Sequence, residues 1–371
     1  MSAPQDTAPP DAASPDAASP DAARPDPARP DAGGRDAAAV RRPTLTQVAA
    51  LAGVSLKTAS RALNREPNVA PGTGQRVRDA ADLLGYRLNG IARDLRRGAT
   101  SALVGLISGD LTNPFYSAVA SGLERELRQY GLQLITANND EDAEQEQALV
   151  DAFLERRVRA LLVVPSAERH EYLAAEGDHG VPFVFVDRPP DGLAADTVLI
   201  DNAAGARSAA EHLLAGGHRR IALVADLARK APQRERIDAF VAAMRAAGNS
   251  GWEPYLRTEV HDVRRAEDTV RELAGMDRPP TAIFTTNNRL TTGALRALRG
   301  DPAPPALIGF DDFDLADVTG TTVVAHDMTA LGREAARLAY ERISGYRGPA
   351  RTVVMSTSLV VRGSGERPPR D

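Results

Sequence analysis

The chain has 371 residues, of which 43% are hydrophobic, and it contains no cysteine. A chain of this length suits two or three packed domains, and the lack of cysteine excludes a disulfide framework and a thiolate metal site. No apolar run approaches the ~18 residues of a membrane-spanning helix, and no secretory signal opens the chain, so we expect a cytoplasmic protein with no membrane partner.

Charge is unevenly distributed along the chain, although the net charge is only −5. Residues 1–40 carry seven Asp and three Arg, which gives −4, and residues 41–99 carry eleven Lys or Arg and four Asp or Glu, which gives +7. Subtracting both values from the total leaves −8 for residues 100–371. The basic block indicates a polyanionic partner such as nucleic acid, although on charge alone a solvated basic surface explains it equally well.

The first 40 residues are predicted to be a disordered tail. They are rich in Ala, Pro and Asp, and Asp recurs every five residues from Asp6 to Asp36. Frequent Pro opposes helix formation, and the segment has almost nothing large and apolar to bury.

Residues 41–87 are predicted to form a small all-α domain. Thr44 is a candidate N-cap with Gln47 three residues later, as in a capping box, and this helix is expected to end at Gly53. A second helix begins with Ser55 as its N-cap and runs to about Asn64, and a third follows within residues 68–86. Residues 88–100 are a linker in which residues 89–97 can form one more short helix.

From residue 101 onward, short apolar runs alternate with helical segments. The predicted strands lie at 101–108, 132–138, 160–166, 182–187, 220–226, 281–287 and 305–311. The predicted helices lie at 115–130, 142–156, 204–217, 233–247, 264–275, 289–299 and 329–344. This alternation predicts parallel sheets covered on both faces, and its length favours two Rossmann-like subdomains. Ligands of such sheets bind beyond the carboxyl ends of the strands, which here are rich in Asp, Asn, Ser and Arg.

The chain resembles the lactose-repressor (LacI/GalR) family of bacterial transcription regulators over about residues 43–365. The segment TLTQVAALAGVSLKTASRALN resembles the helix-turn-helix of that family. The other matching segments, in chain order, are ARDL (92–95), LTNPFY (111–116), VDR (186–188), IDNAAGA (200–206), GHRRIALV (217–224), GFDD (309–312) and LVVRGS (359–364).

The resemblance implies the following architecture. An all-α helix-turn-helix DNA-binding domain (41–87) and a hinge (88–100) precede an α/β core of two Rossmann-like subdomains (101–365), similar to periplasmic binding proteins, and a short tail (366–371). It also implies a homodimer that binds double-stranded operator DNA and changes its affinity when a small molecule occupies the core. A tetramer would need an added assembly segment, so we expect a dimer.

The resemblance implies that the second helix reads DNA in the major groove. Leu56, Lys57 and Arg61 occupy its base-reading positions. Arg61 can pair bidentately with guanine, Lys57 can donate to guanine acceptors, and Leu56 can touch a thymine methyl or merely pack. The short polar side chains suited to phosphate contact are Thr44, Ser55, Thr58, Ser60 and Asn64. Thr44 and Ser55 can equally serve only as helix caps.

Residues 89–97 resemble the hinge helix of the family. Leu95 corresponds to the leucine that wedges into a central base step from the minor groove, and Ala92 is small enough for close approach. Asn89 and Arg93 complete the candidate hinge contacts. The family commonly has Pro just before this Asn, whereas this chain has Leu88.

The core is expected to bind a sugar-like effector between its two lobes. The residues that match family pocket positions are Asp110, Asn113, Phe115, Asp187, Arg236, Asn288 and His326. Asn288 stands where the family usually has Asp, and His326 stands where Gln is common, so the identity of the effector is open. These residues also have structural alternatives: Asn113 can start a helix, Asp187 can cap one, and Arg236 can pair with Glu235 or Asp238.

No enzyme motif was found in the sequence. It has no Walker loop, no H-E-x-x-H and no G-x-S-x-G, and we expect no cofactor, no metal and no catalytic residue. A sugar-processing enzyme and an extracytoplasmic solute-binding protein of similar architecture are the alternatives. Neither of them explains residues 41–99.

Overall fold

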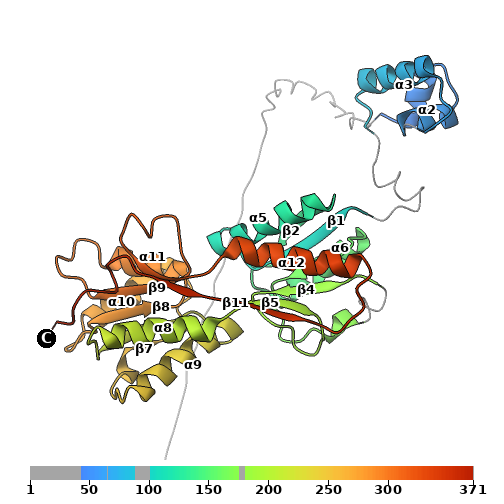
Figure 1. Cartoon of the computed structure of the whole chain (residues 1–371). Helices are drawn as coiled ribbons and strands as arrows, with labels where there is room; N and C mark the ends of the chain where they lie inside the picture. The colour runs from blue at the N-terminus through green and yellow to red at the C-terminus, as the bar shows by residue number, and fades with distance from the viewer. Residues whose placement is uncertain (1–42, 65, 88–100, 175–179, 371) are drawn as a thin grey trace, which may run out of the picture. The chain divides into compact units, whose positions relative to one another are not determined.

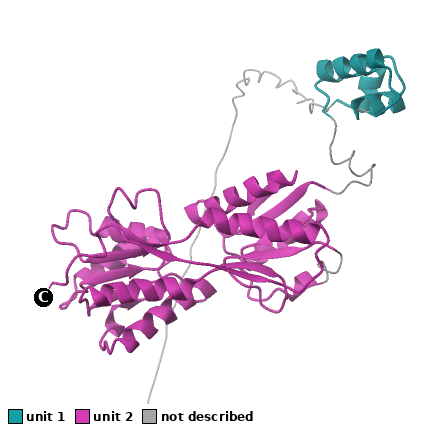
Figure 2. Cartoon of the chain, viewed as in Figure 1, with its two compact units in different colours: residues 1–89 teal, residues 90–371 magenta. Residues whose placement is uncertain are grey.

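The computed structural model describes residues 43–64, 66–87, 101–174 and 180–370. The chain divides into two compact units, residues 1–89 and residues 90–371, and each is described by itself (Figure 2). The predicted tail and the predicted hinge helix lie outside the described residues. Within the described ranges, no helix is both long and apolar enough to cross a membrane.

The N-terminal unit contains three helices, α1 (Leu45–Leu51), α2 (Leu56–Leu63) and α3 (Pro71–Leu84). Their common core is made largely of small apolar side chains, among which Val48, Ala59 and Val77 are fully buried. Small residues at the contacts allow three short helices to pack closely around one centre.

The predicted helix starts of this unit are confirmed. Thr44 forms a capping box with Gln47: the Gln47 amide donates to Thr44 Oγ1 at 3.4 Å, and the Thr44 amide donates to Gln47 Oε1 at 2.8 Å. The Ser55 hydroxyl accepts from the Thr58 amide at 3.1 Å. Gly53 has a φ of 64°, which is the left-handed conformation that glycine adopts easily after a helix.

The C-terminal unit is built from two six-stranded sheets, each the centre of one lobe (Figure 1). The first lobe holds β1 (Leu103–Ser108), β2 (Gln133–Asn138), β3 (Leu161–Val163), β4 (Phe183–Val186), β5 (Asp196–Ile200) and β11 (Thr352–Met355). Its strands are parallel in the order β11-β5-β4-β3-β1-β2.

The second lobe repeats this arrangement. It holds β6 (Ile221–Val224), β7 (Leu256–Arg257), β8 (Ala282–Thr285), β9 (Ala306–Phe310), β10 (Thr322–Ala325) and β12 (Ser358–Val360). The strand order is β12-β10-β9-β8-β6-β7, and only the pairing of β12 with β10 is antiparallel among the pairs described.

Helices cover both faces of each sheet, because the strands are apolar on both sides. In the first lobe, α5 (Pro114–Gln129) and α12 (Met328–Ile343) share one core, and α6 (Ala143–Glu155) belongs to a second core with a short 3-10 turn, η1 (Glu171–Leu173). In the second lobe, α8 (Asn202–Ala215) and α9 (Ala231–Ala246) cover one face, and α10 (Val263–Ala274) and α11 (Asn288–Ala297) cover the other. A second 3-10 turn, η2 (Glu253–Tyr255), precedes β7.

The predicted fold class is confirmed, but the sequence prediction missed five strands. All seven predicted strands and all seven predicted helices of this unit are present. β5 and β10 were missed because each follows its parallel neighbour without an intervening helix. β7, β11 and β12 are short strands at the edges of the sheets, and none of their residues is buried, so they lack the buried apolar run that marks a central strand.

The chain passes between the two lobes three times. The crossings lie between β5 and α8, between β10 and α12, and between β11 and β12 (Figure 1). The first lobe therefore comprises residues 101–200 and 328–355, and the second comprises residues 202–325 and 358–370. Three connections of this kind can act as a hinge, so that the lobes can open and close while the chain keeps them joined.

Candidate functional site

Helix α2 presents an exposed polar side in the N-terminal unit. It buries Ala59 and Ala62 against the other two helices. Leu56 is 51% exposed and Lys57 is also exposed, so both candidate base readers on the first turn are accessible.

Arg61 is held against the segment that follows α2. Its Nη2 donates to the Pro67 carbonyl oxygen at 2.9 Å, and its Nε lies 3.4 Å from a carboxylate oxygen of Glu66. These contacts place the guanidinium at the edge of the exposed face. Bidentate pairing with a guanine requires the guanidinium to leave at least part of this arrangement.

The short polar side chains proposed for phosphate contact interact within the unit. Thr44 and Ser55 act as helix caps, and Ser55 Oγ lies 2.9 Å from Thr58 Oγ1. Asn64 Nδ2 donates to Ser60 Oγ at 3.4 Å. The Thr44 hydroxyl donates to Gln47 Oε1 at 3.2 Å, so Thr44 must exchange that partner to contact a phosphate. The Ser55 hydroxyl can donate to a phosphate if Thr58 Oγ1 is the donor between those two hydroxyls. The candidate hinge residues lie outside the described residues: Asn89, Ala92, Arg93 and Leu95.

A cavity of about 170 Å³, referred to below as the cleft, lies in the C-terminal unit where strand ends of both lobes meet. The first lobe contributes Gly109, Asp110, Asn113, Phe115, Tyr116, Asp140, Glu141, Asp187 and Arg188. The second lobe contributes Asp226, Lys230, Pro232, Gln233, Arg236, His261, Asn287, Arg289 and Asp311. The carboxyl ends of parallel strands thus form the walls, as expected for this kind of sheet.

Five of the seven residues expected to bind the effector line the cleft: Asp110, Asn113, Phe115, Asp187 and Arg236. Asn288 and His326 are not among the residues that line the cleft, and Asn288 lines a neighbouring pocket instead. Asn288 is buried and its Nδ2 donates to Asn113 Oδ1 at 3.0 Å, which joins the two lobes. Asn113 is also the N-cap of α5, so its structural alternative is confirmed alongside its position in the cleft.

The side chain of His326 is fully buried at the crossing between β10 and α12. Its Nε2 lies 3.1 Å from Asp311 Oδ1, and its ring packs edge-on against Phe115 at a centroid distance of 5.7 Å. His326 is therefore not among the residues that line the cleft, and its effector contact stays a prediction. Its position supports Asp311 and Phe115, which do line the cleft.

Glu141 and Arg188 form a buried ion pair in the first-lobe wall. Arg188 donates from Nη1 and Nη2 to the two Glu141 carboxylate oxygens at 2.9 and 3.0 Å. Burial alone would raise the pKa of Glu141, but the hydrogen bonds and charge of Arg188, together with Lys230, lower the pKa to about 2. Glu141 also has a φ of 60°, an uncommon backbone conformation for a residue with a side chain.

Asp187 presents a buried carboxylate to the cleft. It follows β4, has a φ of 70° and caps no helix, contrary to the structural alternative. Its nearest cation is Arg188, whose Nε lies 3.5 Å from Asp187 Oδ2. No hydrogen bond to its carboxylate is found among the described residues, and burial raises its pKa.

Arg236 is fixed from several directions in the second-lobe wall. Its Nε donates to Asn202 Oδ1 at 2.8 Å, and its Nη1 donates to the Thr286 carbonyl oxygen at 2.5 Å. Its guanidinium lies 3.6 Å from the centroid of the Phe310 ring, and Nη2 lies 4.0 Å from Asp311. Arg236 therefore does not make the pairing with Glu235 or Asp238 that was its structural alternative.

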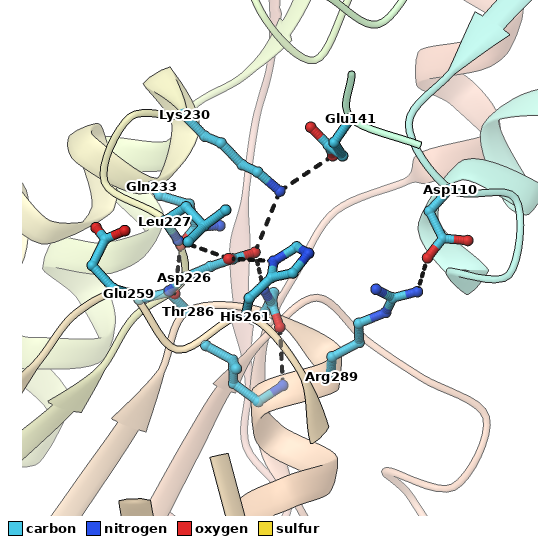
Figure 3. Close-up of polar contacts among 12 residues, drawn as sticks. Asp110, Glu141, Asp226, Leu227, Lys230, Gln233, Glu259, His261, Thr286 and Arg289 are labelled. Atoms are coloured by element: carbon cyan, nitrogen blue, oxygen red, sulfur yellow. Dashed lines mark hydrogen bonds and ion pairs between the residues drawn. The ribbon is translucent and has the colours of Figure 1, made fainter. Parts of the chain in front are cut away.

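Asp226 is the centre of a polar cluster that the sequence prediction missed (Figure 3). Its two carboxylate oxygens contact His261 Nδ1 at 2.8 Å and Asn287 Nδ2 at 3.1 Å, and Lys230 Nζ lies 3.7 Å away. Asp226 directly follows a predicted strand, so its place after β6 was an available signal. The positions of Lys230 and His261 had no such signal in the sequence.

Two ion pairs join the lobes across the cleft (Figure 3). Lys230 Nζ lies 3.2 Å from Glu141 Oε1, and Arg289 is hydrogen-bonded to Asp110. Arg289 also donates to Thr112 Oγ1 at 3.1 Å. The two lobes are therefore joined across the cleft by ion pairs between protein side chains.

Comparisons with known proteins match both units. Residues 44–89 match the family described as bacterial regulatory proteins, lacI family. Residues 101–357 match the family described as periplasmic binding proteins and sugar binding domain of LacI family.

Individual relatives agree with these matches over most of the chain. The HTH-type transcriptional regulator GalS of Salmonella typhimurium is 30% identical, over 86% of this chain and 96% of GalS. CelR of Thermobifida fusca is 34% identical, over 88% of this chain and 99% of CelR. The solved structure of a transcriptional regulator CelR–cellobiose complex has 31% identity and a TM-score of 0.64, and covers 87% of this chain and 100% of that one. The chain belongs to the LacI family of bacterial regulatory proteins.

Proposed function

We propose that this regulator is a cytoplasmic repressor of sugar or related catabolic genes that binds a near-palindromic operator as a homodimer. One recognition helix from each subunit imposes two-fold symmetry on the DNA site. The observation that carries the proposal is the presence of both parts in one chain, an α2 helix with an exposed polar side and an effector-sized cleft.

The proposed DNA contacts come from α2 and the hinge. Leu56, Lys57 and Arg61 read base edges, while Thr44, Ser55, Thr58, Ser60 and Asn64 contact phosphates. Leu95 wedges the central base step, with Ala92 permitting close approach and Asn89 and Arg93 at the backbone. The accessibility of Leu56 and Lys57 supports the first of these assignments.

The proposed effector is sugar-like and binds in the cleft. Asp110, Asn113, Phe115, Asp187 and Arg236 contact it, and Asn288 and His326 act from behind by fixing Asn113 and Asp311. The CelR–cellobiose complex supports a sugar, because that relative covers most of this chain. Effector binding and operator binding are coupled through movement of the two lobes.

The test is selection of operator sequences from random DNA, followed by titration of the selected site with and without sugars. We expect sites with dyad symmetry and an affinity that changes when an effector is added. Selected sites without symmetry would contradict the homodimer, and an affinity that no sugar or related small molecule changes would contradict the effector role of the cleft.

A further inference from the structure

We propose that the cleft takes one uncharged sugar ring and excludes both disaccharides and anionic sugar derivatives. The inference rests on the proposed effector role of the cleft and specifies the chemistry of its ligand. Three features carry it: the volume between the bridged lobes, the pairing of the lining cations, and the Asp187 carboxylate.

The volume of the closed cleft fits one ring. The cleft holds about 170 Å³. A protein cavity of about 150 Å³ accommodates a single benzene ring, so the volume between the bridged lobes matches one ring. Arg289 lines both this cleft and a neighbouring pocket of about 480 Å³. The Asp110–Arg289 and Glu141–Lys230 bridges both line the cleft, and they join the lobes directly. A ligand longer than one ring that extends across either bridge must therefore break it.

The charges that line the cleft disfavour an anion. Six carboxylates and four Lys or Arg side chains form the lining. Each of these four cations lies within 4.0 Å of a carboxylate: Arg188 and Lys230 contact Glu141, Arg289 contacts Asp110, and Arg236 lies near Asp311. A carboxylate or phosphate on the ligand would have to displace one of these carboxylate partners, and for Glu141 and Asp311, whose side chains are largely buried, this leaves a buried charge uncompensated.

The Asp187 carboxylate favours a ligand that carries hydrogen-bond donors. Its side chain is buried, lines the cleft and receives no hydrogen bond from the described residues. A buried carboxylate in this state is stabilised by donors and destabilised by a second negative charge. The hydroxyl groups of a neutral sugar supply such donors, and the adjacent Phe115 provides an apolar surface for the ring.

The test compares three classes of compound on the full-length wild-type protein by thermal shift and calorimetry. The neutral class contains glucose, galactose, ribose, xylose and fructose, the two-ring class contains cellobiose and maltose, and the anionic class contains gluconate and glucose 6-phosphate. We expect a member of the neutral class to raise the melting temperature and bind at least about tenfold tighter than every member of the other two classes.

Two variants test which side chains cause the preference for a neutral single-ring sugar. Asp187→Asn should weaken the neutral sugar by about 10–100-fold without lowering the melting temperature of the ligand-free protein, because the amide removes a buried charge. Arg289→Ala opens one bridge and should admit a disaccharide that contains the preferred ring. The control Arg271→Ala removes an exposed pair with Glu267 on α10 and should leave the ligand preference unchanged.

The outcomes distinguish this inference from the proposed function. If a disaccharide or an anion binds more tightly than every neutral single-ring sugar, the inference is wrong. If that compound also changes operator affinity, the proposed effector role of the cleft is still supported. Binding of none of the compounds also overturns the inference, while selection of a symmetric operator preserves the DNA-binding half of the proposal. If Asp187→Asn binds the neutral sugar as tightly as wild type does, Asp187 does not contact the sugar and that part of the inference is wrong.

Discussion

Under the proposed DNA contacts, single side chains on α2 decide whether the protein distinguishes one DNA sequence from another. Lys57 is free to reach a base edge, whereas Arg61 begins from its contacts with Pro67 and Glu66. A base contact affects binding to one DNA sequence, whereas a phosphate contact affects binding to every sequence. Substituting each of these two residues therefore shows which kind of contact it makes.

Lys57→Ala and Arg61→Ala should each cost about 1–3 kcal/mol on the selected operator and much less on random DNA. Fluorescence anisotropy with both DNAs at one salt concentration measures the difference. Arg76→Ala, an exposed residue on α3, is the control and should affect the two DNAs alike. Equal losses on both DNAs for Lys57→Ala or Arg61→Ala would restrict that side chain to phosphate contact.

Glu141 links side-chain ionisation to the stability of the core. Its pKa is about 2 in the folded protein against an ordinary value of 4.5, so its charged form stabilises the fold. That stabilisation is fully present above about pH 4.5 and is lost as the pH falls toward 2. Glu141→Gln should lower the free energy of unfolding at pH 7 by roughly 1–3 kcal/mol and flatten its fall with acidification.

Urea denaturation of wild type and variant between pH 3 and pH 7 tests this expectation. Glu124→Gln, which removes an exposed pair with Arg128 on α5, is the control and should leave the pH dependence unchanged. Parallel stability curves for wild type and Glu141→Gln would show that Glu141 does not titrate in this range.

At the scale of secondary structure, the contact between α5 and α12 depends on two glycines. A Cβ at Gly122 would lie 2.1 Å from the carbonyl oxygen of Thr329, and a Cβ at Gly332 would lie 2.1 Å from that of Val119. The backbones of the two helices therefore touch directly. Because α12 returns the chain from the second lobe, this contact anchors the returning segment in the first.

Gly122→Ala should destabilise the C-terminal unit by about 1–3 kcal/mol, because the backbone of α12 must move to admit a methyl group. Gly275→Ala is the control, since its Cβ would meet only ordinary contacts at 3.6 Å at the end of α10. Urea unfolding measures both variants. If Gly122→Ala has the same free energy of unfolding as the control, the two helices can move apart without loss of stability.

The sequence predicted features that depend on local chemistry. Caps such as Thr44 and Ser55 have their partners within three residues, and Asp187 and Asp311 follow apolar strands whose carboxyl ends face the cleft. The Glu141–Lys230 bridge joins residues 89 positions apart, in loops without a periodic pattern. His326 matched a pocket position in sequence, but its side chain contacts Phe115 and Asp311 and is not part of the cleft lining.

At the scale of the whole molecule, regulation requires that the cleft and the operator influence each other. Thermodynamic linkage makes the effect reciprocal: if an effector changes operator affinity by some factor, the operator changes effector affinity by the same factor. Such coupling is typically about 1–3 kcal/mol. It is measurable by titrating the effector with and without saturating operator.

Arg236→Lys should reduce or abolish this coupling while leaving operator affinity without effector near normal. Lysine keeps the charge but cannot make the separate contacts to Asn202 and Thr286 that fix the guanidinium. Operator titrations with and without effector measure the change, and thermal melting verifies that the second lobe remains folded. A wild-type response in this variant would show that Arg236 does not transmit effector binding.

The three crossings between the lobes impose an order on folding during synthesis. Neither lobe is complete until α12, β11 and β12 have been made, whereas α1, α2 and α3 possess their own core near the N-terminus. At ~5–20 residues per second, the ribosome needs roughly 15–55 s to extend the chain from the end of the N-terminal unit through β12. During that interval, each nascent chain carries a folded DNA-reading helix without a finished core to control it.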